Sequence, residues 1–194
     1  MTIEFIDNKS KFFTDVKTLG RKYSATLGFM PDGGFDDYAK NKCIIVAHDG
    51  RGLAGYLMFR VAFPLSRISI VHLCFSDYYR GKNVSTALFK ALKEKFEKKY
   101  RGISLSCRTD FTYASNRWRK LGFVPLGRVR SRSYDPHYLK IWWYDFNLPN
   151  LFSVSTNFKV KALLDMNIIV KLREAERTEA VNPLEDPRGL LADW

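Results

Sequence analysis

One stretch of the sequence constrains the fold most: an apolar strand that runs through a basic turn into a helix. Arg67–Phe75 is apolar on both faces at its centre, which predicts a central strand covered on both sides. From Val84 to Phe96 the apolar residues recur with a helical period, which predicts an amphipathic helix. The turn between them carries Arg80 and Lys82. Because the unpaired N–H groups and the dipole of a helix start both favour anions, we predict an anion site at this junction.

The flanking segments predict an α/β (mixed α+β sheet) fold, with a central mixed sheet flanked by helices. Gly28–Gly34 holds several glycines and a proline and predicts a loop. The other elements predicted from periodicity are a helix over 10–27, strands over 43–47 and 53–60 that form a hairpin, a strand over 103–107, a helix over 114–121, and strands over 123–129 and 139–148.

Charge is unevenly divided along the 194 residues. The chain has a net charge of +12, and residues 1–150 hold 26 Lys and Arg against 13 Asp and Glu. A basic body favours a polyanionic partner, such as a nucleic acid, a membrane surface or a phosphate-rich cofactor. An aromatic content of 15% argues against a disordered chain.

Two other classes of protein are not expected from the composition. No window of about 18 apolar residues predicts a membrane span. The three cysteines include no CxxC pair, so we expect neither a disulfide framework nor a zinc site, and no metal. A reducing, cytoplasmic location is the expectation that follows from this cysteine usage.

Two sequence motifs resemble those of the GNAT acetyltransferase family. The run Leu73–Leu88 resembles its acetyl-CoA-binding motif, and Ala114–Phe123 is similar to its second motif, a helix that ends in Lys-Leu-Gly-Phe. Their order and spacing also fit, and the resemblance covers about residues 1–148. It implies a GNAT-like fold, acetyl-CoA as cofactor and an amine as acceptor.

The resemblance also implies roles for individual residues. The backbone near Cys74 and Phe75 would take the pantetheine and polarise the thioester carbonyl, as an oxyanion hole does. The family's pyrophosphate pattern has Gly where this chain has Asn83, and Gly or Ala where it has Ser85. Asn tolerates a left-handed backbone better than most residues, and Ser is small. The residues expected to bind the pyrophosphate are Arg80, Gly81, Lys82, Asn83, Val84, Ser85 and Thr86.

The acid and the base of the reaction are less defined by the sequence. The family often has a Tyr that protonates the CoA thiolate, but here that position is Trp118, whose indole gives up no proton. Tyr144 is our candidate acid, with Tyr113, Tyr134 and Tyr138 as alternatives. His72, on the central strand, is our candidate base. Asp110 is a weaker base candidate, and water is an alternative base. Cys74 is an alternative acyl-accepting nucleophile.

The sequence pattern changes after residue 150, which predicts a domain over residues 1–150 and a strand-helix extension over 151–194. Val160–Leu164 predicts a strand that delivers Asp165, and 167–180 predicts a helix. This segment resembles the opening of a PIN-type nuclease domain, whose first Asp helps bind a divalent metal. The residues after Asp165 are too few for such a domain, so the resemblance implies a truncated start and no nuclease activity. The alternative is a strand and helix that pack on the first domain, with Asp165 as a cap.

The function predicted from these observations is N-acyl transfer from acetyl-CoA to an amine by direct attack in a ternary complex. The alternative is a GNAT-like module that binds nucleic acid through its basic face, beside a nuclease domain. Basic and aromatic residues interleave over Arg128–Tyr138, which suits phosphate contacts and stacking on bases. A CoA-sensing regulatory domain is a third hypothesis. The sequence leaves the acceptor and the oligomeric state open.

Overall fold

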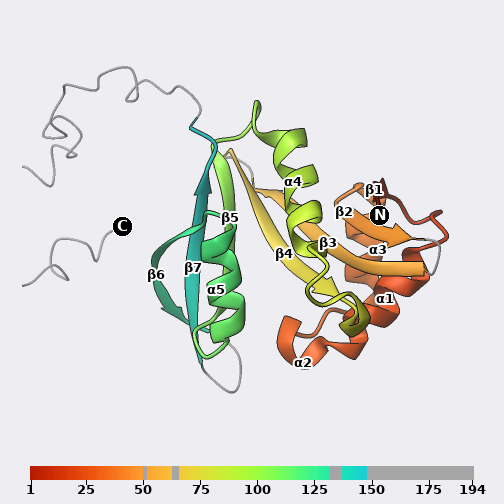
Figure 1. Ribbon diagram of the computed structural model, residues 1–194, viewed down its shortest axis with the longest axis horizontal. Helices are drawn as coiled ribbons and strands as arrows, with labels where there is room; N and C mark the ends of the chain where they lie inside the picture. The colour runs from red at the N-terminus through yellow and green to blue at the C-terminus, as the bar shows by residue number, and fades with distance from the viewer. Residues whose placement is uncertain (50–51, 63–65, 132–136, 148–194) are drawn as a thin grey trace, which may run out of the picture. The chain divides into compact units, whose positions relative to one another are not determined.

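A seven-stranded mixed sheet, in the order β1-β2-β3-β4-β5-β7-β6, forms the centre of the computed structural model (Figure 1). The structure describes residues 1–49, 52–62, 66–131 and 137–147, all within the compact unit Met1–Leu148. The strands are β1 (Thr2–Ile6), β2 (Ile44–Asp49), β3 (Gly52–Ala62), β4 (Arg67–Phe75), β5 (Gly102–Arg108), β6 (Val124–Arg130) and β7 (Tyr138–Asp145). The helices are α1 (Phe13–Lys22), α2 (Ser24–Leu27), α3 (Asp32–Lys40), α4 (Val84–Phe96) and α5 (Thr112–Lys120), with a 3-10 turn, η1, at Asp77–Tyr79.

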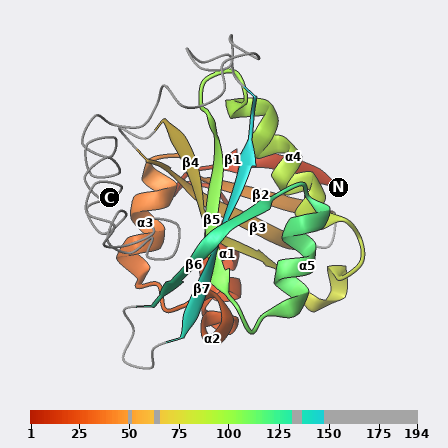
Figure 2. The ribbon, with the colours of Figure 1, turned by 90° about the vertical axis from the view of Figure 1, so that its left-hand side faces the viewer.

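Helices cover both faces of the sheet, as Figure 2 shows with α4 and α5 on one side and α3 on the other. On the α4 and α5 side, Leu88 and Leu92 of α4 pack with Leu57 and Ile103 in one hydrophobic cluster. On the α1 and α3 side a second cluster contains Val16, Phe35, Val46, Tyr56 and Met58. The N-terminal strands therefore lie between two apolar layers, which accounts for the near-continuous apolar run in β3.

The sheet opens between its two central strands. β4 and β5 are parallel, whereas every other neighbouring pair of strands is antiparallel. Along the described strands, β4 pairs with β5 only where Arg67–Ser69 meets Gly102–Ser104. Figure 1 shows the two strands meeting at one end and separating toward the other. Beyond Ser69 the edge of β4 that faces β5 has no neighbouring strand in the described residues, so its N–H and C=O groups are available to a ligand.

A β-bulge in β4 changes which side chains face each side of the sheet. Met58 of β3 lies opposite His72 and Phe59 lies opposite Ile70, so Val71 has no partner on β3. Before the bulge, Ile70 belongs to the cluster on the α4 side, whereas Cys74, after it, belongs to the cluster on the α1 side. The bulge thus turns the tip of β4 so that His72 and Cys74 share the face of α1 and α3.

The structure confirms the predicted fold class and the strand-turn-helix junction, and it corrects three details. The helix predicted over 10–27 is two helices, because the chain leaves the helical conformation at Tyr23. The loop predicted over Gly28–Gly34 is wrong in its second part, since α3 begins at Asp32 and buries Phe35 and Ala39. The sequence analysis missed β1, which pairs with β2. The strand and helix predicted after residue 150 lie outside the described residues.

No helix in the described part of the chain is long and apolar enough to cross a membrane. The same residues hold no group of three or more His, Cys, Asp and Glu side chains that could bind a metal ion.

Candidate active site

A cavity of about 410 Å³ fills the opening between β4 and β5. Its walls come from five parts of the fold: the tip of β4, the end of β5, the α1–α2 segment, the inner side of α5 and the start of β7 with the residue before it. It is lined mostly by apolar and aromatic side chains, together with three arginines, Arg80, Arg108 and Arg117. Cys74 and Phe75 of the predicted thioester site line this cavity, and of the predicted pyrophosphate residues Arg80 alone lines it.

The turn before α4 has the backbone that an anion site needs. Gly81 and Asn83 both have positive φ, +78° and +57°, so Asn83 takes the left-handed conformation that was expected of it. No side chain caps the start of α4, and its first turn holds no acidic residue. The first N–H groups of this 13-residue helix therefore point outward, next to Arg80 and Lys82.

Arg80 is held by a network that reaches α1. Nη2 of Arg80 lies 2.8 Å from Oδ1 of Asp77, and the Tyr23 hydroxyl donates to Oδ2 of the same carboxylate at 2.6 Å. The hydrogen bond from Tyr23 and the nearby charges of Arg80 and Lys22 lower the pKa of Asp77. Tyr23 also lines the cavity. The sequence analysis placed residue 23 inside the helix predicted over 10–27 and missed this contact with the turn.

Arg117 on α5 also reaches the start of α4. Its Nε donates to Oγ of Ser85 at 2.8 Å, and its Nη2 donates to the Thr86 hydroxyl. Ser85 is 5% exposed, and Arg117 lines the cavity. The sequence analysis did not single out Arg117, because residues 31 and 32 positions apart give no periodic signal.

Cys74 is unsuited to nucleophilic attack. Its side chain is buried, and burial raises the pKa of its thiol to about 12. The thiolate, which is the nucleophile, is therefore scarce at neutral pH. The role that remains for Cys74 and Phe75 is the predicted one of their backbone, at the tip of β4 where the strand edge opens to the cavity.

His72, the candidate base, is buried on the α1 side of β4 and does not line the cavity. Its Nδ1 lies 3.1 Å from the Tyr56 hydroxyl oxygen in a hydrogen bond, and Phe35 packs edge-on to its ring. Burial lowers the pKa of His72 below 6.5 and keeps the ring neutral at neutral pH. His137, immediately before β7, does line the cavity. The role of His72 stays a prediction.

The candidate acid Tyr144 lies away from the cavity. Its ring packs against Phe89, Phe123 and Phe146 on the α4 and α5 side of the sheet. Trp118 does line the cavity and packs edge-on to Phe123, with ring centroids 5.3 Å apart. Among the described tyrosines, Tyr23 and Tyr113 line the cavity, so the geometry favours them over Tyr144.

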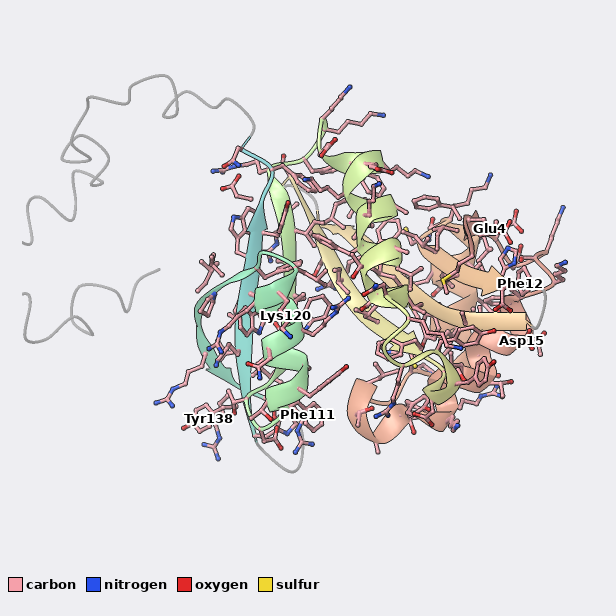
Figure 3. All side chains as sticks on the ribbon, in the orientation of Figure 1. Glu4, Phe12, Asp15, Phe111, Lys120 and Tyr138 are labelled. Atoms are coloured by element: carbon pink, nitrogen blue, oxygen red, sulfur yellow. The ribbon has the colours of Figure 1, made fainter. Side chains whose placement is uncertain are left out.

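Asp110 is bound by Arg108 at the end of β5. Two hydrogen bonds join them, from Nε to Oδ1 at 3.1 Å and from Nη2 to Oδ2 at 2.6 Å, and the Arg108 guanidinium also lies over the ring of Phe111. The hydrogen bonds from Arg108 lower the pKa of Asp110, which weakens it as a base. Figure 3 shows Phe111 and Tyr138 at the same end of the molecule, where the Thr109 N–H donates to the Tyr138 carbonyl at 3.0 Å.

A comparison of the chain with known protein families identifies the family to which it belongs. A family described as "Acetyltransferase (GNAT) domain" matches residues 31–137 of the chain. The chain belongs to the GNAT acetyltransferases. It is therefore an acyltransferase, and acetyl-CoA is its cofactor. No curated protein sequence matches the chain.

Solved structures agree with this family in fold. Ard1 from Thermoplasma volcanium is 17% identical, with a TM-score of 0.64 over 74% of this chain and 96% of that one. An N-acetyltransferase from Staphylococcus aureus Mu50 is 15% identical, with a TM-score of 0.64 over 75% and 97%. An aminoglycoside 6'-N-acetyltransferase complexed with coenzyme A is 13% identical, with a TM-score of 0.62 over 77% and 99%.

The residues of this GNAT chain fit acetyl-CoA. The uncapped start of α4, flanked by Arg80, Lys82 and Arg117, suits a diphosphate. The unpaired edge of β4 suits a pantetheine, whose amides need hydrogen-bond partners. Asn83 and Ser85, which depart from the family pattern, disturb neither feature.

Proposed function

We propose that the chain is an N-acetyltransferase that passes an acetyl group directly to an amine while both substrates occupy the cavity between β4 and β5. One observation carries the proposal: a single cavity is lined both by Arg80 of the turn and by Tyr23 and Thr26 of the α1–α2 segment. The turn takes the cofactor, and the α1–α2 wall takes the acceptor. Because the high pKa of Cys74 argues against an acyl-cysteine, the amine attacks the thioester itself.

The chain's own groups orient the reaction. Acetyl-CoA supplies an activated acetyl group. The backbone at the tip of β4 holds and polarises the reacting carbonyl, as an oxyanion hole does. His137 accepts the proton of the amine, because it is the described histidine that lines the cavity. Tyr113 is the proposed hydrogen-bond donor to the departing thiol, whose pKa near 8.5 makes a strong acid unnecessary.

Calorimetric titration with acetyl-CoA tests the cofactor turn. Arg80→Glu places a negative charge beside the diphosphate, and we expect it to reduce affinity by at least about 100-fold. Arg119→Glu makes the same charge change on α5, where the guanidinium lies over Trp142, and we expect it to bind normally. Equal affinity of Arg80→Glu and the wild type would contradict the assignment of the turn.

Radiolabelled acetyl-CoA tests direct transfer. Incubated without an acceptor, the protein should remain unlabelled after denaturation, and CoA should appear only when an amine is added. A short peptide with a free amino terminus and spermidine are suitable first acceptors. Stable label on Cys74 would replace direct attack with a two-step mechanism.

A specific surface supports a second candidate function, the binding of nucleic acid. Arg128 pairs with Lys140 and Arg130 with Tyr138 across β6 and β7, so these four residues lie on one face. We name them the β6–β7 basic strip. The Arg128 guanidinium lies 5.1 Å from the centre of the Tyr138 ring. Cations interleaved with aromatic rings suit a phosphate backbone and its bases.

Fluorescence anisotropy with a labelled 20-nucleotide uridine RNA tests this candidate. Arg128→Glu/Arg130→Glu should weaken binding and lower the slope of log K against log salt by about 2. Lys98→Glu/Lys99→Glu, a matched pair of exposed lysines after α4, should leave the slope nearly unchanged. Equal effects of the two pairs would show that net charge, and not the strip, attracts RNA.

A further inference from the structure

The contact between α5 and the start of α4 brings a cation to an unusual place. Arg117 donates through Nε and Nη2 to the hydroxyls of Ser85 and Thr86, in the first turn of α4. A guanidinium at a helix N-terminus is opposed by the helix dipole, whose positive end lies there. Arg80 and Lys82 stand in the preceding turn, and the first turn of α4 holds no acidic residue. Asp77 pairs with Arg80, but Lys82 and Arg117 still leave the local charge positive, which favours an anion with several oxygens.

Arg117 is also presented toward the cavity with its orientation fixed. It lines the cavity together with Arg80. A guanidinium has five N–H donors in a rigid planar fork. The two hydroxyls take two donors and hold the plane of the group, and the remaining donors are available to oxygens in the cavity. A pre-oriented guanidinium loses little side-chain entropy when it binds a phosphate.

We infer that Ser85 and Arg117 act as a pair in which Ser85 positions Arg117 and Arg117 binds the diphosphate of the cofactor. This inference rests on the cofactor site of the proposed function. It also accounts for the departure from the family pattern at residue 85. A Gly or Ala there has no hydroxyl and would leave the guanidinium with the Thr86 hydroxyl alone, so the buried Ser85 completes the pair of partners that fixes its plane.

Titration calorimetry with CoA and with pantetheine, which lacks the diphosphate, separates binding from structure. We expect Arg117→Met to weaken CoA binding by about 10- to 100-fold and to leave pantetheine binding unchanged. Arg119→Met, on the same helix but over Trp142, should change neither affinity. Arg117→Lys keeps the charge without the fork and should fall between wild type and Arg117→Met.

A double-mutant cycle tests the pairing. Ser85→Ala should weaken CoA binding by about 3- to 10-fold in the wild type and have little further effect in Arg117→Met, because the serine acts through the arginine. The salt dependence of CoA binding should be shallower in Arg117→Met than in the wild type.

Three results would overturn the inference, each in a recognisable way. Normal CoA affinity of Arg117→Met would show that the guanidinium does not bind the diphosphate. Equal losses for CoA and pantetheine would assign Arg117 a structural role only. Additive effects of the two substitutions would remove the pairing. A wild-type chain that binds neither ligand would instead refute the cofactor site itself, and the inference with it.

Discussion

β3 and β6 belong to one sheet, yet their surroundings differ completely. In β3, the six residues Ala54–Phe59 are all buried, between a helix layer on either face. In β6, all seven residues are exposed, and the strand lies at the edge of the sheet. β3 also pairs with the tip of β4, where the acetyl group would be held. The inner strand thus supports the backbone that we propose holds the acetyl group, and the outer strand presents side chains to the surroundings.

Charge is also unevenly distributed along the chain. Residues 1–49 hold seven acidic and seven basic side chains, so the N-terminal segment is neutral. Residues 101–131 and 137–147, which contain β5, α5, β6 and β7, hold eight Lys and Arg against two Asp. Residues 52–62 and 66–100 hold a similar excess, nine Lys and Arg against three Asp and Glu, so the basic excess begins after the N-terminal segment and continues to the sheet edge.

Gly55→Ala should give the largest difference between the two strands. A Cβ at Gly55 would lie 2.6 Å from the Cys74 carbonyl oxygen and 2.9 Å from Cα of Phe75, both backbone atoms of β4. We expect a loss of about 3 kcal/mol in the free energy of unfolding, because neither atom can move cheaply. Gly127→Ala on β6 meets nothing within 4 Å and should cost less than about 1 kcal/mol. Urea unfolding measures both, and equal costs would remove the contrast.

A pH titration of stability probes the buried side of β3, where the Tyr56 hydroxyl contacts His72. Burial lowers the pKa of His72 below 6.5, so the folded state resists protonation that the unfolded state accepts. The free energy of unfolding should therefore fall as pH drops from 7 through 6.5 and continue to fall until the folded His72 is protonated. His72→Gln should show a flatter profile in urea unfolding between pH 7 and 5. Identical slopes for the two proteins would contradict the lowered pKa.

Val124→Thr should have the smallest effect. Val124 is the first residue of β6, 53% exposed, so an added hydroxyl stays in water, and we expect a change within about 0.5 kcal/mol. Val46→Thr makes the same substitution in β2 at a fully buried position and should cost about 2 kcal/mol. Thermal melts of the two variants compare edge and interior directly. A loss at Val124 that approaches that at Val46 would mean that β6 is covered in solution.

The sequence predicted those parts of the fold that local patterns encode. The residues from Arg67 to Phe96 predict a strand, a turn and a helix in succession, and the structure has all three. Asn83 could also be expected in a left-handed conformation. α3 was missed because its start holds Gly33 and Gly34, and its helix depends on the burial of Phe35. β1 alternates polar and apolar residues, so a period-two signal was available for it.

Of the residues at the site, the sequence predicted only those that lie close to one another along the chain. Cys74, Phe75 and Arg80 were found because they belong to one motif, and they do line one cavity. Arg117 and Tyr23 reach the same site from other elements, through contacts that only the packing of α5 and α1 creates. His72 and Tyr144 were chosen by residue type, and the bulge at Val71 and the packing of Phe89 decide where their side chains lie.

In the described strands, β4 and β5 pair over three residues on each strand, and this short pairing joins the two halves of the sheet. From Ser69 to Phe75 the strand is about 20 Å long, given about 3.3 Å per residue. A rotation of about 5° at this pairing would displace the tip of β4 by about 1.7 Å. That displacement is about half the distance between two atoms positioned to react. A packing change around Ser69 or Ser104 that produced such a rotation would therefore move the tip of β4, the proposed meeting point of the acetyl group and the amine, by more than it moved the junction itself.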